Sequence, residues 1–160
     1  YTDRLKMANI AQVVNVLQSM ILTKGNQMTL TPTYHVFRMY NVHQDATYLP
    51  LDIQVATKKV DGNRTIPMLS GTASRDQQGK IHISLSNVDL QNVQDVSINL
   101  QGVDAKRVTG EILTSANITD HNTFDKPEQV KPVAFNGASI SGNTLKVKLP
   151  AKSIVTLELQ

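Results

Sequence analysis

The sequence has 160 residues, with 16 basic and 13 acidic side chains, a formal net charge of +3 and no cysteine. This composition excludes disulfides and cysteine-ligated metal sites, and no apolar run reaches the roughly 18 residues that a membrane-spanning helix needs. The basic side chains are scattered along the chain rather than clustered, so we expect neither a nucleic acid nor a membrane as a partner.

Residues 3–22 have the apolar spacing of a long helix. Apolar side chains recur every three or four residues, at Met7, Ile10, Val14, Leu17 and Ile21, and a second apolar set widens the stripe to most of the circumference. A helix that is apolar nearly all round is typically buried, so it should have a partner. Thr2 or Asp3 could cap its start, and Gly25 with Asn26 follow its end.

A second, shorter helix is predicted to begin at Thr31-Pro32 and to run to about Tyr40. Thr31 suits the N-cap position, and Pro32 suits the first helical position, where a missing N–H costs nothing.

From Tyr48 onward the period of the apolar residues drops to two, which is typical of strands with one buried face. Turn signals at 61–63, 78–80, 101–102 and 141–143 separate the candidate strands, and the pattern favours a β-sandwich. Residues 115–137 are less regular, and we interpret them as a long surface connection. The alternating sets are Leu49/Leu51/Ile53/Val55, Ile81/Ile83/Leu85, Val96/Ile98/Leu100 and Leu145/Val147/Leu149, with a last strand at 154–159.

Few residues suggest catalysis or metal binding. The three glutamates, Glu111, Glu128 and Glu158, stand in no recognisable catalytic motif. The four histidines lack the tight spacing of metal ligands, so we expect packed or exposed histidines, no metal and no cofactor. We therefore assign no catalytic residue within these 160 positions.

Two blocks of the sequence carry a family resemblance. Residues 3–18, DRLKMANIAQVVNVLQ, and residues 31–40, TPTYHVFRMY, resemble α-L-arabinofuranosidases of glycoside hydrolase family 51. The ending LPAKSIVTL, at 149–157, is also similar to the last strand of that family.

The resemblance implies an architecture and an activity. Such enzymes have a catalytic (β/α)8 barrel followed by a jelly-roll-like β-sandwich, so we expect a mainly β fold preceded by two helices from the end of the barrel. Residues 1–45 would be that helical end and its connection, and residues 46–160 the sandwich. The parent would be a retaining glycoside hydrolase that removes terminal arabinofuranosyl residues from polysaccharides or oligosaccharides.

Because the sequence starts at Tyr1 and the family's catalytic glutamates lie on barrel strands upstream, we expect an inactive C-terminal fragment of a bacterial enzyme. Its partners would be the barrel of the same chain and, through it, arabinose-containing glycans. The compartment of the parent is left undecided.

The resemblance also implies one substrate contact. Gln12 matches a family glutamine that contacts the arabinose ring, so it is the candidate substrate-binding residue. On the predicted helix it shares a stripe with Asn9, Asn15 and Ser19. For Asn9 and Asn15 we favour hydrogen bonds to the barrel backbone over sugar contact.

Two other functions remain open from the residues alone. One is a carbohydrate-binding module, although only Phe124 and Phe135 are aromatic after Tyr48 and there is no tryptophan to form a stacking platform. The other is a structural or oligomerisation domain. Because family members are generally oligomeric, a homo-oligomer is compatible with the enzyme reading.

Overall fold

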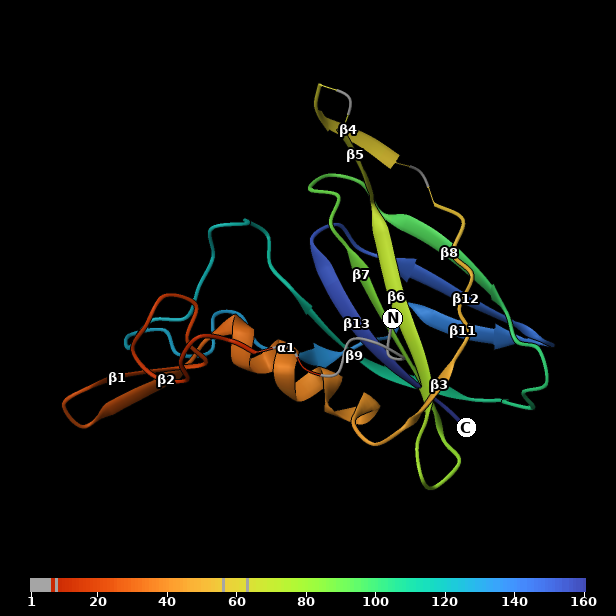
Figure 1. Cartoon of the computed structure of the whole chain (residues 1–160), viewed down its shortest axis with the longest axis horizontal. Helices are drawn as coiled ribbons and strands as arrows, with labels where there is room; N and C mark the ends of the chain where they lie inside the picture. Colours follow the sequence, from red (N-terminus) through yellow and green to blue (C-terminus); the bar gives the residue numbers. More distant parts are fainter. Residues whose placement is uncertain (1–6, 8, 56, 63) are drawn as a thin grey trace.

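The computed structural model describes residues 7, 9–55, 57–62 and 64–160. Figure 1 shows a β-sandwich on one side and, next to it, a helix with a hairpin and the loop that follows β9. Among the described residues, all regular structure after residue 46 is β-strand, as the period-two pattern predicted. No described helix is long and apolar enough to cross a lipid bilayer.

The helix predicted at 3–22 is wrong over residues 7 and 9–22, and the proposed caps at Thr2 and Asp3 lie outside the described residues. Asn15 and Gln18 adopt left-handed backbone angles, with φ of 54° and 60°. Ile21–Lys24 forms strand β1, which pairs with β2 (Gln27–Leu30).

Two physical features explain this error. The segment contains a run of β-branched side chains, Val13, Val14 and Val16, whose χ1 freedom a helix restricts. Gly25 has φ of +59° and lies in the β1–β2 turn. Gly25 and Asn26, which we expected to follow the end of a helix, therefore form the turn of a hairpin. The apolar side chains are not buried either, since Leu17 is 91% exposed and Met7 74%.

The second predicted helix is confirmed as α1 (Pro32–Tyr40). The Thr31 side chain accepts a hydrogen bond from the Tyr34 N–H, and Pro32 occupies the first turn, as the sequence predicted. A short 3-10 helix, η1 (Asn41–His43), continues from the end of α1 and leads the chain to the sandwich.

The sandwich consists of two antiparallel sheets. The larger has the order β10-β9-β13-β7-β6-β3 and the smaller the order β11-β12-β8. The strands of the larger sheet are β3 (Thr47–Leu49), β6 (Leu69–Arg75), β7 (Ile81–Asn87), β9 (Val108–Thr114), β10 (Val133–Ala134) and β13 (Ser153–Leu159). Those of the smaller sheet are β8 (Gln94–Asn99), β11 (Ala138–Ser141) and β12 (Thr144–Leu149). A separate hairpin, β4 (Thr57–Asp61) with β5 (Arg64–Pro67), projects from one end in Figure 1.

The main core lies between the two sheets, which confirms the expected sandwich. Val155 and Leu157 of β13 and Leu145 and Leu149 of β12 are completely buried there. Gly110 of β9 lies so close to β13 that a Cβ atom would come within 2.6 Å of a Leu157 side-chain carbon. Only glycine fits this contact without displacing its neighbour.

The alternating set at 49–55 is partly buried and faces the core as predicted, although only its first residue belongs to a strand. Leu51, Ile53 and Val55 pack against the core, but β3 ends at Leu49. Hydrophobic alternation therefore indicated which side chains face the core and did not indicate whether the backbone joins a sheet.

A second, smaller core joins α1 to the outer face of the larger sheet. Met39 of α1, Leu113 of β9 and Val130 of the loop are buried together, with Val36, Tyr40 and Ile154 packed around them. The loop contribution comes from residues 115–132, which carry no strand, in agreement with the predicted long connection; β10 lies near the end of the predicted range.

Asn122 holds this loop against the hairpin. Its side-chain amide is buried and donates to the carbonyls of Leu30 (2.8 Å) and Val130 (2.9 Å), and its Oδ1 accepts from the Val130 N–H (2.7 Å). One side chain thus satisfies three backbone groups that would otherwise lack partners.

We expect Asn122→Ala to lower the free energy of unfolding by about 2–3 kcal/mol, because buried backbone groups lose their partners. Denaturant unfolding monitored by circular dichroism measures this. Asn117→Ala is the control, since Asn117 is an exposed amide of the same loop, and its effect should stay within about 0.5 kcal/mol. Equal effects of the two variants would contradict the role given to Asn122.

Candidate functional site

Gln12 lies on an exposed, irregular segment rather than on a helix, and it does not line the pocket described below. The polar stripe predicted with it does not form. Asn9 is exposed, whereas Asn15 binds Thr23 of β1, with its Nδ2 donating to Thr23 Oγ1 (2.8 Å) and its Oδ1 accepting from the Thr23 N–H (2.7 Å). Ser19 is buried and donates to the Ile21 carbonyl.

The three glutamates are each held by a cation. Glu111 binds Arg38 (2.5 Å), Glu128 binds Lys131 (2.6 Å) and Glu158 binds Lys80 (2.9 Å). A side-chain hydrogen bond from Lys131 lowers the pKa of Glu128, and hydrogen bonds from Gln160 and Lys80 lower that of Glu158.

These environments do not suit acid catalysis. A glycosidase acid needs a raised pKa, and its partner carboxylate stands about 5–5.5 Å away in a retaining enzyme. The environments of Glu128 and Glu158 shift their pKa values in the opposite direction, and Glu111 is occupied by its ion pair with Arg38.

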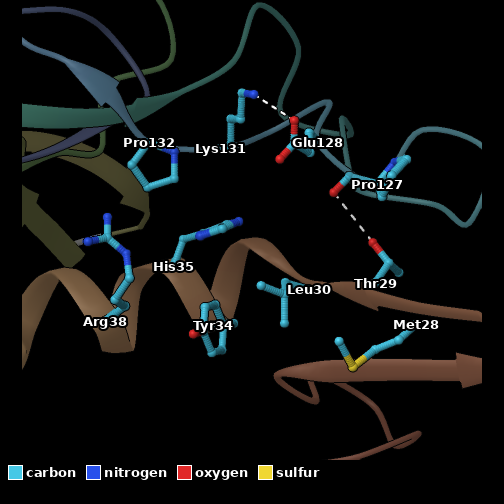
Figure 2. A pocket seen from close by; sticks show the side chains of 10 residues that line it. All are labelled: Met28, Thr29, Leu30, Tyr34, His35, Arg38, Pro127, Glu128, Lys131 and Pro132. Carbon is cyan, nitrogen blue, oxygen red and sulfur yellow. Dashed lines mark hydrogen bonds and ion pairs between the residues drawn. The ribbon is translucent and has the colours of Figure 1, made fainter.

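A pocket of about 540 Å³ opens between the hairpin, α1 and the 115–132 loop. One face of α1 contributes Tyr34, His35 and Arg38, and the loop faces them with Glu128 and Lys131 (Figure 2). The hairpin and the loop are joined at the rim by a hydrogen bond from Thr29 Oγ1 to the Pro127 carbonyl (3.4 Å). Sequence reasoning missed this pocket because its two walls are about 90 residues apart in the chain.

His35 lies at the centre of the pocket wall, edge-on to the Tyr34 ring at a centroid distance of 5.5 Å. Burial lowers the pKa of His35, and the positive charge of Arg38 lowers it further, against weaker opposing effects of Glu111 and Glu128. Its Nδ1 is buried and has no hydrogen-bond partner among the described residues. The imidazole is therefore neutral near pH 7, with one nitrogen as donor and the other as acceptor.

A histidine–hydroxyl cluster lies on the outer face of the larger sheet. His43 of η1 places its Nδ1 2.7 Å from Ser74 Oγ and its Nε2 2.8 Å from Ser84 Oγ, and Ser84 contacts Thr156 Oγ1 at 3.0 Å. Ser74, Ser84 and Thr156 are all buried, so no hydroxyl here is accessible as a nucleophile. The cluster anchors η1 to the sheet, and burial together with nearby His82 lowers the pKa of His43.

Of the remaining histidines, His82 is buried and His121 is exposed. His82 Nε2 lies 2.9 Å from Asp76, and His121 Nδ1 lies 2.9 Å from the Thr119 carbonyl. Within the described part of the chain, no three histidine or acidic side chains are grouped so that they could hold a metal ion.

A family model and a close relative show the family of the chain. A family model described as the alpha-L-arabinofuranosidase C-terminal domain matches residues 1–153. The chain is 63% identical over 160 residues to the intracellular exo-alpha-L-arabinofuranosidase of Bacteroides ovatus, a match that covers all of this chain and 31% of that protein. It is 29% identical over 145 residues to alpha-L-arabinofuranosidase 1 of Arabidopsis thaliana, which covers 87% of this chain and 20% of that protein.

Solved structures give the same result. The GH51 arabinofuranosidase from Xanthomonas axonopodis pv. citri superposes with a TM-score of 0.95 at 47% sequence identity, over 99% of this chain and 32% of that chain. The chain therefore spans less than a third of the length of these three relatives.

The His43 cluster predicts a pH dependence of stability. Because the pKa of His43 is lowered from its ordinary value of 6.5 in the folded state, the unfolded state binds more protons below pH 6.5. The contribution of the neutral His43 to the free energy of unfolding should therefore be complete above pH 6.5. It should decrease as the pH falls from 6.5 through the pKa of His43 in the folded state. His35 contributes in the same direction.

The test compares the wild type with His43→Gln, which keeps a donor and an acceptor but does not titrate. Denaturant unfolding at pH 7.5, 6.5, 5.5 and 5.0 should give a shallower decrease for the variant. If both proteins lose stability equally over this range, the His43 cluster does not respond to pH as described.

Proposed function

The chain belongs to the alpha-L-arabinofuranosidase C-terminal domain family, and we propose that it is the C-terminal part of a retaining enzyme that removes terminal arabinofuranosyl residues from arabinose-containing polysaccharides or oligosaccharides. The observation that carries this proposal is the 63% identity over all 160 residues to an exo-alpha-L-arabinofuranosidase. Because this chain matches only 31% of that protein, we assign the chemistry to a catalytic barrel elsewhere in the same polypeptide.

The proposed division places the end of the barrel and its connection at residues 1–45 and the sandwich at residues 46–160. Exposed apolar side chains support a barrel partner for the first part. Met7 and Leu17 are largely exposed and Val13 is half exposed, which is unfavourable for such side chains unless another surface covers them. In this division α1 is the joint, because Met39 and its neighbours pack on the sandwich.

We propose that Gln12 contacts the substrate sugar. An amide side chain both donates and accepts hydrogen bonds, as sugar hydroxyls do. Its exposed position leaves the side chain available to a ligand that lies between this segment and the barrel. Self-association of the parent is also proposed, and the exposed apolar side chains of Val88, Leu90 and Ile118 would suit a contact between copies.

The activity is tested on two proteins, the full-length polypeptide and residues 1–160 alone. The full-length protein should hydrolyse an aryl α-L-arabinofuranoside, whereas residues 1–160 should give no turnover because the carboxylate pair is missing. Turnover by residues 1–160 that disappears in Glu111→Gln or Glu158→Gln would overturn the proposal.

In the full-length protein, Gln12→Ala should lower kcat/KM for the aryl α-L-arabinofuranoside. The expected loss is about 1–3 kcal/mol of transition-state stabilisation, or roughly 5- to 150-fold. Glu158→Gln is the control: Glu158 lies on β13 and does not line the pocket between the hairpin, α1 and the 115–132 loop, so its replacement should leave kcat/KM unchanged. Full efficiency of Gln12→Ala would show that Gln12 does not contact the sugar.

A further inference from the structure

Each charged side chain that lines the pocket between α1 and the 115–132 loop is already paired with an opposite charge. Arg38 is paired with Glu111, and Lys131 with Glu128. A guanidinium has five N–H donors and a carboxylate about four acceptor sites, so each pair keeps unused hydrogen-bonding capacity. A charged ligand would compete with one member of each pair for the opposite charge. A neutral ligand rich in hydroxyl groups could bind both pairs without disturbing them.

The walls of the pocket combine these polar groups with flat apolar surfaces. The Tyr34 ring, Pro127 and Pro132 line it (Figure 2), and its volume of about 540 Å³ is within the range of small-molecule sites. Sugars present the same mixture, because hydroxyl groups surround the apolar C–H faces of the ring.

His35 adds a neutral hydrogen-bonding group to this wall. Its Nδ1 is buried with no partner among the described residues, and a buried N–H without a partner is rarer than a buried acceptor without one. We therefore place the ring proton on Nε2, at the tip of the ring that points across the pocket in Figure 2. In this form His35 can donate a hydrogen bond to a hydroxyl group.

The segment that carries Gln12 is connected to one wall of the pocket through the hairpin. Val14, two residues after Gln12, forms a backbone bridge with Ile21 of β1. Ile21 pairs with Leu30 of β2, and Leu30 lines the pocket. The segment that carries the proposed sugar contact thus runs beside the hairpin that forms one pocket wall.

From these observations we propose that the pocket is an accessory subsite for neutral pentose units of the substrate, beyond the arabinofuranosyl unit that is removed. This inference rests on the proposed function. It adds a second contact region on the same polypeptide, with His35, Lys131 and Glu128 as the polar contacts and Tyr34 as the apolar one.

The test uses the full-length protein and compares substrates of different length. For each variant, kcat/KM is measured on an aryl α-L-arabinofuranoside and on linear arabino-oligosaccharides of two to six units, and the ratio of the hexamer value to the aryl value is calculated. His35→Ala and Lys131→Ala should each lower this ratio about 5- to 20-fold.

Lys80→Ala is the matched control. Lys80 also binds a glutamate, its side chain is 47% exposed against 46% for Lys131, and it does not line the pocket. It should leave the ratio unchanged. Thermal unfolding of all three variants shows whether each is folded. If Lys131→Ala does not fold, the ratio measured for His35→Ala tests the proposal.

Isothermal titration calorimetry separates this inference from the proposed function. Where the full-length protein hydrolyses arabinohexaose, the titrations use a full-length background in which a barrel carboxylate required for turnover of the aryl substrate is replaced, so that the hexamer stays intact. Arabinohexaose should bind this background, and His35→Ala in the same background should bind it about tenfold more weakly. An oligogalacturonate of similar length should bind less well because it is charged. Absence of turnover on the aryl substrate would overturn the proposed function, whereas hexamer binding that depends on His35 would still support the pocket. Equal hexamer-to-aryl ratios and equal affinities across wild type, His35→Ala and Lys131→Ala would overturn the subsite.

Discussion

Strand β13 is the element on which the rest of the structure depends. It pairs over its full length with β7 on one side and β9 on the other. Its inward side chains, Val155, Leu157 and Leu159, form the centre of the main core. Because both of its neighbours are strands, its backbone groups are paired within the sheet, which a buried strand requires.

The outward side chains of β13 organise the layer that covers the larger sheet. Ile154 packs into the small core beneath α1, Thr156 contacts Ser84 in the His43 cluster, and Glu158 binds Lys80 at the surface. One strand thus fixes the main core through its inner face, and the helix and η1 through its outer face. The helix in turn presents two faces: Val36, Met39 and Tyr40 toward the sandwich, and Tyr34, His35 and Arg38 toward the pocket.

The sequence was sufficient to predict elements whose stability is local or whose pattern is regular. The capped helix at Pro32–Tyr40 was predicted because Thr31 and Pro32 act on adjacent residues, and the sandwich strands were predicted because their alternation persists. The prediction of a helix at 3–22 was wrong over the described residues, because the spacing of apolar residues alone does not distinguish a buried helix from an apolar segment that includes a hairpin. The role of Asn122 could not be predicted, because Leu30, which it joins to the loop, is 92 residues away. The role of His35 could not be predicted, because the loop that faces it in the pocket is about 90 residues away.

The distribution of aromatic and charged side chains explains why binding chemistry is expected beside the sandwich rather than within it. After Tyr48 the chain has only two aromatic residues, and the described core between the sheets consists of aliphatic side chains with Phe135 packed against them. The pocket, by contrast, is built from a helix face and a long loop that the sandwich holds in place through Met39, Leu113 and Val130.

Loops positioned by a rigid scaffold commonly carry function, since they can vary without loss of the core. In this chain the scaffold fixes the loop twice, through the small core and through the Asn122 amide, so Glu128 and Lys131 face His35 from a restrained backbone. A restrained backbone loses less conformational entropy when a ligand binds, which favours a site made of a few polar groups over one made of a large contact area.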